Sequence, residues 1–194
     1  PGYYLKPKLS FQANQYSGIL TNSPSTSINQ SLNQPIQGFA LPTLSLDSGL
    51  AFERDATEMK GLFGRDMIVT MEPRAFYVYT PFQSQAQTPL FDTADAGFGI
   101  TQIFSENTFV GNDRVADNNK LTMGLTSRVL ETNTGAERAT VTLAQRQDFT
   151  GQRVGLNGTI QNPTRYSDTL GASTIRLLGN FNVDLFGQYN TQLN

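Results

Sequence analysis

The sequence contains neither histidine nor cysteine. Histidine is the usual general base at neutral pH, and the two residues together supply most metal ligands in proteins. Their absence argues against an enzyme, so we expect no catalytic residues, no cofactor and no metal site. The lack of cysteine is compatible with any cellular compartment and therefore does not indicate the localisation.

Charge is scarce as well. Charged residues make up 15% of the chain, against roughly 25% in typical soluble domains. The net charge is −2 and no basic cluster is present, so the sequence lacks the positive surface that nucleic-acid binding requires. We expect no nucleic acid among the partners.

Long apolar runs are also missing. No stretch approaches the 18 apolar residues that a membrane-spanning helix needs. The opening residues Pro1-Gly2-Tyr3-Tyr4 show neither the charged nor the apolar region of a signal peptide. A membrane protein with this sequence would have to cross the bilayer with β-strands.

What the chain does have is alternation of apolar and polar residues, with the period of two that a β-strand requires. Seven segments show it, at 3–15, 44–57, 66–80, 119–131, 138–149, 167–178 and 181–191. Long polar links (16–43, 81–118 and 150–166) alternate with short ones (58–65, 132–137 and 179–180). The sequence therefore predicts an all-β fold, an antiparallel meander of about seven strands.

The segment at 119–131 shows two distinct faces. One face carries Leu121, Met123, Leu125 and Val129, and the other carries Lys120, Thr122, Gly124, Thr126 and Arg128. In a β-sandwich the apolar face lies inside, whereas in a membrane barrel it contacts lipid and the polar face lines the lumen. The alternation alone leaves both architectures open.

Three further features favour the barrel. The segments run to about 11–15 residues, against about 5–6 in globular proteins. Strict alternation of long and short links is typical of outer-membrane barrels, whereas sandwiches use Greek-key crossovers. Aromatic residues such as Tyr3, Tyr77 and Tyr79 lie near strand ends, as in interfacial girdles. We expect an arc of a large transmembrane β-barrel, with Leu121, Met123, Leu125 and Val129 facing lipid.

Turn-forming residues agree with this assignment. Gly179-Asn180 fits a two-residue hairpin turn, and Asn133-Thr134-Gly135 occupies another short link. Pro73 lies inside a strand pattern and has no N–H to donate, so it predicts a bulge or a local break. Pro42 suggests the same at the start of the second strand.

Five motifs resemble those of a known family. Residues 71–82 (MEPRAFYVYTPF) resemble the LEPR-x-x-Y-x-Y-x-P strand of LptD, the lipopolysaccharide-assembly outer-membrane protein family also called organic solvent tolerance protein. Residues 89–93 (PLFDT), 102–114 (QIFSENTFVGNDR) and 119–128 (NKLTMGLTSR) resemble the next motifs of that family, and residues 52–55 (FERD) an earlier one. The motifs follow the family order over 52–128.

The resemblance implies that the whole span 1–194 is a partial β-barrel, a central piece of the family's C-terminal barrel domain. It implies lipopolysaccharide as cargo and the outer membrane of a Gram-negative bacterium as location. It also implies two partners, an LptE-like lipoprotein plug in the lumen and an LptA-like periplasmic bridge that docks on an N-terminal domain outside this chain. The function would be insertion of lipopolysaccharide into the outer leaflet, without covalent chemistry.

Two groups of residues are candidates for this role. The candidate lumen-facing residues are Glu72, Arg74, Arg128 and Arg146, which would guide an anionic glycolipid, contact the plug, or form structural ion pairs in a wet interior. The link 81–118 is long enough to indicate a function, and its apolar residues indicate that it packs on something. Its candidate lid residues are Phe91, Asp92, Phe104, Phe109, Asp113 and Arg114.

Other interpretations stay open. A cluster of Asp92, Asp95, Asp113 and Asp117 suggests calcium, but their spacing does not match an EF-hand and favours solvated carboxylates. A passive porin-like channel would need opposed rows of charge in a constriction loop, whereas Arg114 is the one basic residue of 81–118. A soluble β-sandwich binding module is the third alternative, and it would stay in solution without detergent.

Overall fold

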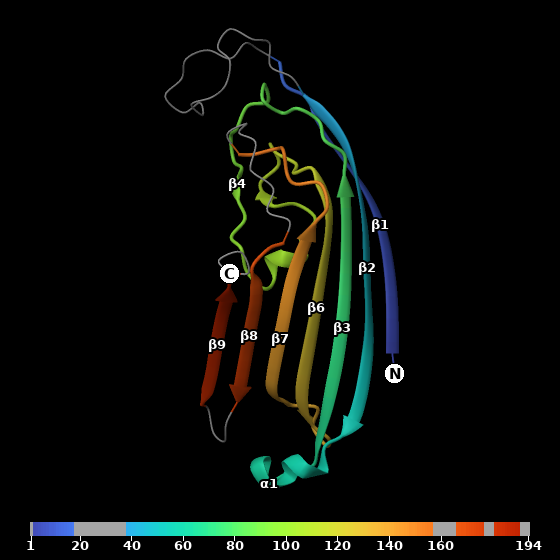
Figure 1. The fold of residues 1–194 in the computed structure, drawn as a ribbon, viewed down its shortest axis with the longest axis vertical. Helices are drawn as coiled ribbons and strands as arrows, with labels where there is room; N and C mark the ends of the chain where they lie inside the picture. The colour runs from blue at the N-terminus through green and yellow to red at the C-terminus, as the bar shows by residue number, and fades with distance from the viewer. Residues whose placement is uncertain (1, 18–37, 157–165, 177–180, 191–194) are drawn as a thin grey trace.

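The computed structural model describes residues 2–17, 38–156, 166–176 and 181–190. Its main feature is one antiparallel sheet of seven strands in the order β1-β2-β3-β6-β7-β8-β9 (Figure 1). Each long strand pairs with the next long strand along the chain, and the two end strands do not pair with each other. The predicted all-β meander is confirmed, as an open sheet in the form of an arc.

The strands agree closely with the predicted segments. They are β1 (Gly2–Asn14), β2 (Phe39–Asp55), β3 (Met67–Thr80), β6 (Asn118–Glu131), β7 (Glu137–Asp148), β8 (Thr169–Arg176) and β9 (Asn182–Tyr189). Every described boundary lies within two residues of the prediction except one, because β2 begins at Phe39 rather than at residue 44.

The early start of β2 has a tertiary cause. Phe39 and Leu41 are buried against Val115, which belongs to the long link between β3 and β6. Pro42 consequently lies inside the strand, opposite Phe11 of β1, and the ladder passes through it without a break. The irregularity predicted at Pro42 is wrong, since β3 pairs with β2 only from Leu44 onward and needs no N–H from this proline.

At Pro73 the prediction of a local break is confirmed. The ladder between β2 and β3 stops at Gly49–Arg74 and resumes at Phe52–Met71 in the same register. The missing rungs lie beside Pro73, which cannot donate a hydrogen bond. The ladder on the other side of β3, with β6, continues through this proline, so the irregularity is a gap on one side and not a bulge.

The short links form tight structures. The link predicted at 58–65 contains most of the 3-10 helix η1 (Thr57–Met59), which begins one residue earlier, and the helix α1 (Lys60–Phe63), which Gly64 ends in the left-handed conformation. The turn predicted in 132–137 is confirmed, with Gly135 at φ 69° donating its N–H to the Glu131 carbonyl at 2.9 Å. The predicted turn at Gly179-Asn180 lies outside the described residues.

The long link between β3 and β6, residues 81–117, contains three small elements: β4 (Ala94–Asp95), the 3-10 helix η2 (Gln102–Phe104) and β5 (Phe109–Val110). We call it the covering loop, because it folds back along one face of the sheet. It lies at the upper end of the molecule in Figure 1, and α1 lies at the opposite end. None of the described helices is long and apolar enough to cross a bilayer.

The turn after β6 allows a direct test of backbone conformation. A side chain added at Gly135 would meet nothing within 4 Å, so only its positive φ of 69° opposes substitution. In the full-length protein that carries this segment, Gly135→Ala should lower the free energy of unfolding by about 1 kcal/mol. Gly61→Ala, in the short helix with open space around it, is the matched control and should not destabilise. Equal thermal unfolding midpoints for the two variants would contradict the assigned turn.

Candidate functional site

Strand register divides the sheet into two faces of opposite character. One face, which we call the charged face, carries Lys6, Lys8, Asp47, Glu53, Asp55, Glu72, Arg74, Lys120, Arg128, Glu137, Arg146, Asp148, Arg176 and Asp184. The candidate lumen residues Glu72, Arg74, Arg128 and Arg146 all belong to it. The opposite face, which we call the apolar face, carries Leu121, Met123, Leu125 and Val129.

The apolar face is exposed across the sheet. Its exposed members include Tyr3, Leu5, Leu9, Phe11, Leu44, Leu46, Leu50, Phe52, Met71, Tyr79, Met123, Leu125, Val141, Leu143, Leu185 and Tyr189. Met123 is 54% exposed, whereas Leu121 and Val129 are half-buried. Two charged residues in the regular ladder of this face, Arg54 and Glu131, lie at the lower end, next to the short links.

Two serine side chains within the apolar face are satisfied by the main chain. The hydroxyl of Ser127 donates to the Thr70 carbonyl at 2.9 Å, and that of Ser48 donates to the Ala75 carbonyl at 3.2 Å. A hydroxyl bonded in this way does not need water. These two hydroxyls therefore need no hydrogen bond from the surroundings of the face.

Two of the candidate lumen residues form ion pairs within the charged face. Arg74 makes a two-pronged contact with Asp47, with both N···O distances at 2.8 Å. Arg128 lies between Glu72, at 3.2 Å, and Glu137, at 3.5 Å. These side chains match the ion-pair alternative raised by the sequence, although Arg74 has a second contact with the covering loop.

Arg146 binds the covering loop directly. Its guanidinium donates to the main-chain carbonyls of Gln102, at 3.1 Å, and of Ile103. The hydroxyl of Thr122, on the neighbouring strand, donates to the same Ile103 carbonyl at 2.9 Å. The Ile103 side chain is fully buried with Ala144 and Leu170 of the sheet. One turn of the loop is thus fixed on the charged face by both polar and apolar contacts.

Phe104 fills a position where the sheet has no side chain. A Cβ atom added at Gly124 would lie only 2.6 Å from the Phe104 Cζ atom, so glycine makes room for the ring. The Arg74 guanidinium lies over the ring, 4.3 Å from the ring centroid. Such cation–π contacts contribute about 0.5–2 kcal/mol. Gly124 and Arg74 together define where the loop can sit.

Glu106 ties the loop to three strands. Its carboxylate accepts hydrogen bonds from the Ser45 hydroxyl at 2.6 Å and from the Lys8 ammonium at 2.8 Å. Its main-chain carbonyl accepts one from the Asn118 side chain at 2.9 Å. Sequence reasoning missed this residue, because its lysine partner lies 98 positions away and no local pattern connects them.

Asp113 organises the upper part of the loop. Its carboxylate accepts hydrogen bonds from the N–H groups of Phe91, at 2.7 Å, and of Asp92, at 2.9 Å, and from the Tyr16 hydroxyl, at 3.0 Å. Although burial opposes it, the hydrogen bonds from the Asp92 and Phe91 N–H groups hold the pKa of the Asp113 carboxyl below its usual range. Asp113 is therefore a structural anion.

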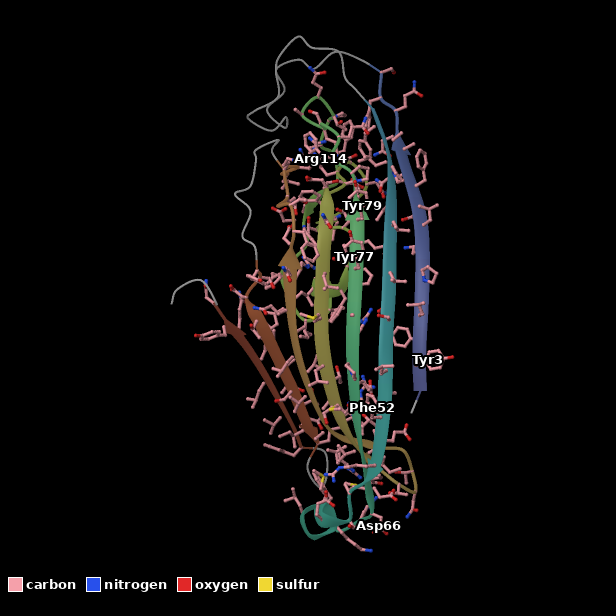
Figure 2. All side chains as sticks on the ribbon, turned by 45° about the vertical axis from the view of Figure 1, so that its right-hand side comes forward. Tyr3, Phe52, Asp66, Tyr77, Tyr79 and Arg114 are labelled. Atoms are coloured by element: carbon pink, nitrogen blue, oxygen red, sulfur yellow. The ribbon has the colours of Figure 1, made fainter. Side chains whose placement is uncertain are left out.

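Arg114 is 1% exposed and belongs to the same region, where Figure 2 shows it among the side chains of the upper end. Its guanidinium donates to the Thr88 carbonyl at 2.8 Å and to the Asp113 carbonyl at 3.1 Å. Burial lowers the pKa of this guanidinium. The side chain connects two irregular segments of the loop, around Thr88 and around Asp113, and is shielded from solvent.

The remaining candidate lid residues differ in burial. Phe109 is buried with Ala116 and Val154, whereas Phe91 is 76% exposed and Asp92 is exposed. Asp113 and Asp117 are buried, whereas the sequence favoured solvated carboxylates. Both accept hydrogen bonds from main-chain N–H groups, which replace those from water. Within the described parts of the chain, no three acidic residues come together in a way that could hold a metal ion.

Other side chains replace the regular backbone pairing that the loop lacks. Gln85 both donates to and accepts from the main chain of Val115, at 2.7 and 3.0 Å. Asn107 accepts from the Ala116 N–H at 3.0 Å. Sequence reasoning missed both residues. Amide side chains bonded to the main chain in this way mark an ordered loop, but a single sequence does not distinguish them from solvated ones.

Comparison with known proteins gives one consistent result. The family model described as LPS transport system D matches residues 1–194. The chain is 52% identical to the LPS-assembly protein LptD of Cupriavidus metallidurans, covering 98% of this chain and 22% of that protein. It is 47% identical to the protein of the same name from Ralstonia nicotianae, covering 100% of this chain and 23% of that protein. The chain thus spans less than a quarter of the length of these relatives.

The contact between Gly124 and Phe104 predicts how the loop can be displaced. Gly124→Val in the full-length protein should push the Phe104 ring off the sheet, because the nearest added atom would overlap the ring. Cleavage by chymotrypsin after Phe104, measured by mass spectrometry, should increase about tenfold or more. Gly187→Val, on the apolar face with open space around it, is the control. Unchanged cleavage in the Gly124 variant would mean that the loop does not rest on this strand.

Asp113 predicts a dependence of loop order on charge and pH. Asp113→Asn should lower the free energy of local opening by about 1–3 kcal/mol, because charge-assisted hydrogen bonds are lost. Hydrogen exchange at the Phe91 and Asp92 amides, corrected for intrinsic rates, measures this, and Asp95→Asn at an exposed site is the control. Since the folded pKa lies below the ordinary value of 3.8, the stabilisation is complete above that value and is lost only as pH falls further. Loss of protection already at pH 6 would contradict this role.

Proposed function

Because this chain belongs to the LptD family of LPS transport proteins, we propose that it forms part of the outer-membrane translocon that inserts lipopolysaccharide into the outer leaflet. The chain would supply a stretch of barrel wall and a lid, and the rest of the full-length protein would complete the pore. One observation carries the proposal: the apolar face is bare, while the upper part of the charged face is covered by the protein's own loop.

A bilayer is the solvent that suits the apolar face. Leaving apolar surface in water costs about 25 cal/mol per Å², and the exposed residues extend from β1 to β9. A β-sandwich would bury this face against a second sheet, but the second sheet among the described residues is the small β4-β5 pair, which belongs to the covering loop on the charged face. Hydrocarbon also requires that polar groups be satisfied internally, as Ser48 and Ser127 are by main-chain carbonyls.

The height of the apolar face suits a membrane. Tyr77 and Tyr79 lie on its upper part, and Phe52 lies lower, as Figure 2 shows. Phe52 pairs with Met71, eight residues from Tyr79 along β3. At about 3.4 Å per residue this separation is roughly 27 Å along the strand, or roughly 19–22 Å along the membrane normal at a tilt of about 35–45°, which fits within the roughly 25 Å apolar band of outer-membrane barrels.

The charged face would line the lumen, with the covering loop as a lid at its upper end. Bacterial barrels place long loops outside the cell and short turns in the periplasm, so the covering loop would be extracellular and α1 periplasmic. Below the lid, a hollow of about 440 Å³ is bordered by Tyr4, Glu72, Arg74 and Arg128. Its charged lining suits the anionic sugar chain of the cargo or a polar surface of a plug.

Transport of this kind needs no covalent step. We propose an LptE-like lipoprotein as the plug of the lumen and an LptA-like periplasmic bridge that delivers lipopolysaccharide through the rest of the full-length protein. The lid rests on the sheet through Ile103, Phe104 and Arg146 rather than through opposed rows of charge. This seating favours a gated translocon over a passive porin-like channel.

The assignment of faces predicts opposite responses to the same substitution. Met123→Arg should destabilise the full-length protein in bilayers by about 2–4 kcal/mol, because it places a charge in the hydrocarbon. Thr126→Arg, three residues along the same strand but on the charged face opposite Glu72, should cost much less. A folding titration in lipid vesicles measures both. Equal destabilisation would mean that the faces, or the membrane assignment, are wrong.

The lid assignment predicts a permeability defect. Replacing Ile103 and Phe104 by serine should release the loop, because it removes the buried contacts with Ala144, Leu170 and Gly124. Cells that carry this variant of the full-length protein should become sensitive to large antibiotics that the outer membrane normally excludes. The matched control replaces Phe98 and Val110, two exposed residues of the same loop, by serine. Normal exclusion in the first variant, at equal protein level, would contradict the lid.

A further inference from the structure

A groove of about 580 Å³ lies at the lower end of the apolar face. Its floor is formed by Val129, Ala139 and Ile175, which are neighbours across β6, β7 and β8. Its wall is formed by Met59, Leu62 and Phe63 of the short helical link, and its rim by Arg65, Glu131, Arg138 and Arg176. This volume is within the range of about 300–1,000 Å³ typical of small-molecule sites.

The wall of the groove is unusually apolar for a short link. Leu62 is 77% exposed, although a leucine on a surface helix of a soluble protein usually turns inward. The helical link presents it beside the lower edge of the apolar face, together with Phe63. Apolar side chains at this height would contact the parts of the acyl chains that lie next to the headgroups.

At the rim, two arginine side chains donate hydrogen bonds to one carboxylate. Glu131 is 3% exposed and accepts hydrogen bonds from Arg65, at 2.9 Å to each oxygen, and from the Arg138 Nε atom, at 2.6 Å. Two guanidinium groups against one carboxylate leave a surplus of positive charge. About half of the Arg65 side chain remains exposed, with donors available to a further anion.

A β-bulge creates this arrangement. The register between β6 and β7 shifts from Val129–Ala139 to Leu130–Glu137, so Arg138 is the inserted residue. Such an insertion changes the direction of a side chain, here at the lower end of two interior strands. Here it brings a guanidinium beside the apolar floor. Arg176 also borders the groove, but its guanidinium is paired with Glu137 of the charged face, at 3.7 Å.

We propose that this groove binds one glycerophospholipid of the leaflet on the side of the short links. The forked guanidinium groups of Arg65 and Arg138 suit a phosphate, and an acyl chain would extend along Val129, Ala139 and Ile175. The floor of the groove is part of the apolar face, so the lipid would enter from the bilayer. This inference rests on the proposed function, since it requires that the apolar face contact lipid.

Site-specific photocrosslinking in the full-length protein, in its native outer membrane, tests the proposal. The photoreactive residue p-benzoylphenylalanine replaces Leu62 in one protein and Met123 in another, and lipid adducts are identified by mass spectrometry. An adduct with intact phospholipid mass is expected at both positions. Arg65→Gln should lower the adduct yield at Leu62 about fivefold, since charge-assisted hydrogen bonds to the phosphate are lost, and leave the yield at Met123 unchanged.

Two further variants control the experiment. Arg54→Gln removes an arginine from the same end of the same face outside the groove, and should leave both yields unchanged. Arg65→Lys keeps the charge with less change to the local packing, and should give an intermediate yield at Leu62. In both Arg65 variants Glu131 retains Arg138 and Thr134 as partners, and the amount of assembled barrel is measured in parallel.

The outcomes separate the two proposals. Lipid adducts at Met123 together with an unchanged yield at Leu62 in both Arg65 variants would overturn the groove and leave the proposed function standing. Adducts at Leu62 to a protein alone would overturn it in favour of a protein partner. Absence of lipid adducts at Met123 would overturn the facing itself, and with it both proposals.

Discussion

The register of the seven-stranded sheet is the constraint on which the rest of the structure depends. A slip of one residue would exchange the two faces of a strand, and the ladder of β3 with β6 runs without interruption from Met67–Glu131 to Thr80–Asn118. That register brings Thr122 under the covering loop and leaves Met123 on the bare side of the sheet. The seat of the loop and the exposed apolar face are therefore two consequences of one pairing.

The covering loop solves a different problem, because a long irregular segment must satisfy its own backbone while it covers a charged surface. Side chains do this work. Gln85, Asn107 and Asp113 bond to main-chain groups within the loop, while Glu106 and Arg146 connect the loop to the sheet. The charges of the sheet are thus partly used for structure. Those farther down the charged face, such as Glu72 and Arg128, remain beside an open hollow.

Much of the fold could be predicted from the sequence, since alternation identifies strands wherever one face is apolar. The break at Pro73 followed from its missing N–H. The early part of β2 could not be found in this way, because Phe39 and Leu41 are held by Val115 from a distant link. The roles of Gly124 and Glu106 could not be predicted for the same reason. Gly124 makes room for Phe104 of the covering loop, and the partners of Glu106 lie on β1 and β2. Strand patterns record local geometry, whereas these residues act through contacts between distant segments.

The central claim is that the apolar face contacts lipid and the charged face contacts water. The most direct test is electron paramagnetic resonance on nitroxide labels placed at Met123 and Thr126 of the full-length protein in bilayers. Collision rates with oxygen, which concentrates in hydrocarbon, and with a water-soluble nickel chelate report the surroundings of each label. The account predicts high oxygen and low nickel accessibility at Met123, and the reverse at Thr126. Equal nickel accessibility at the two positions, or the opposite pattern, would contradict it.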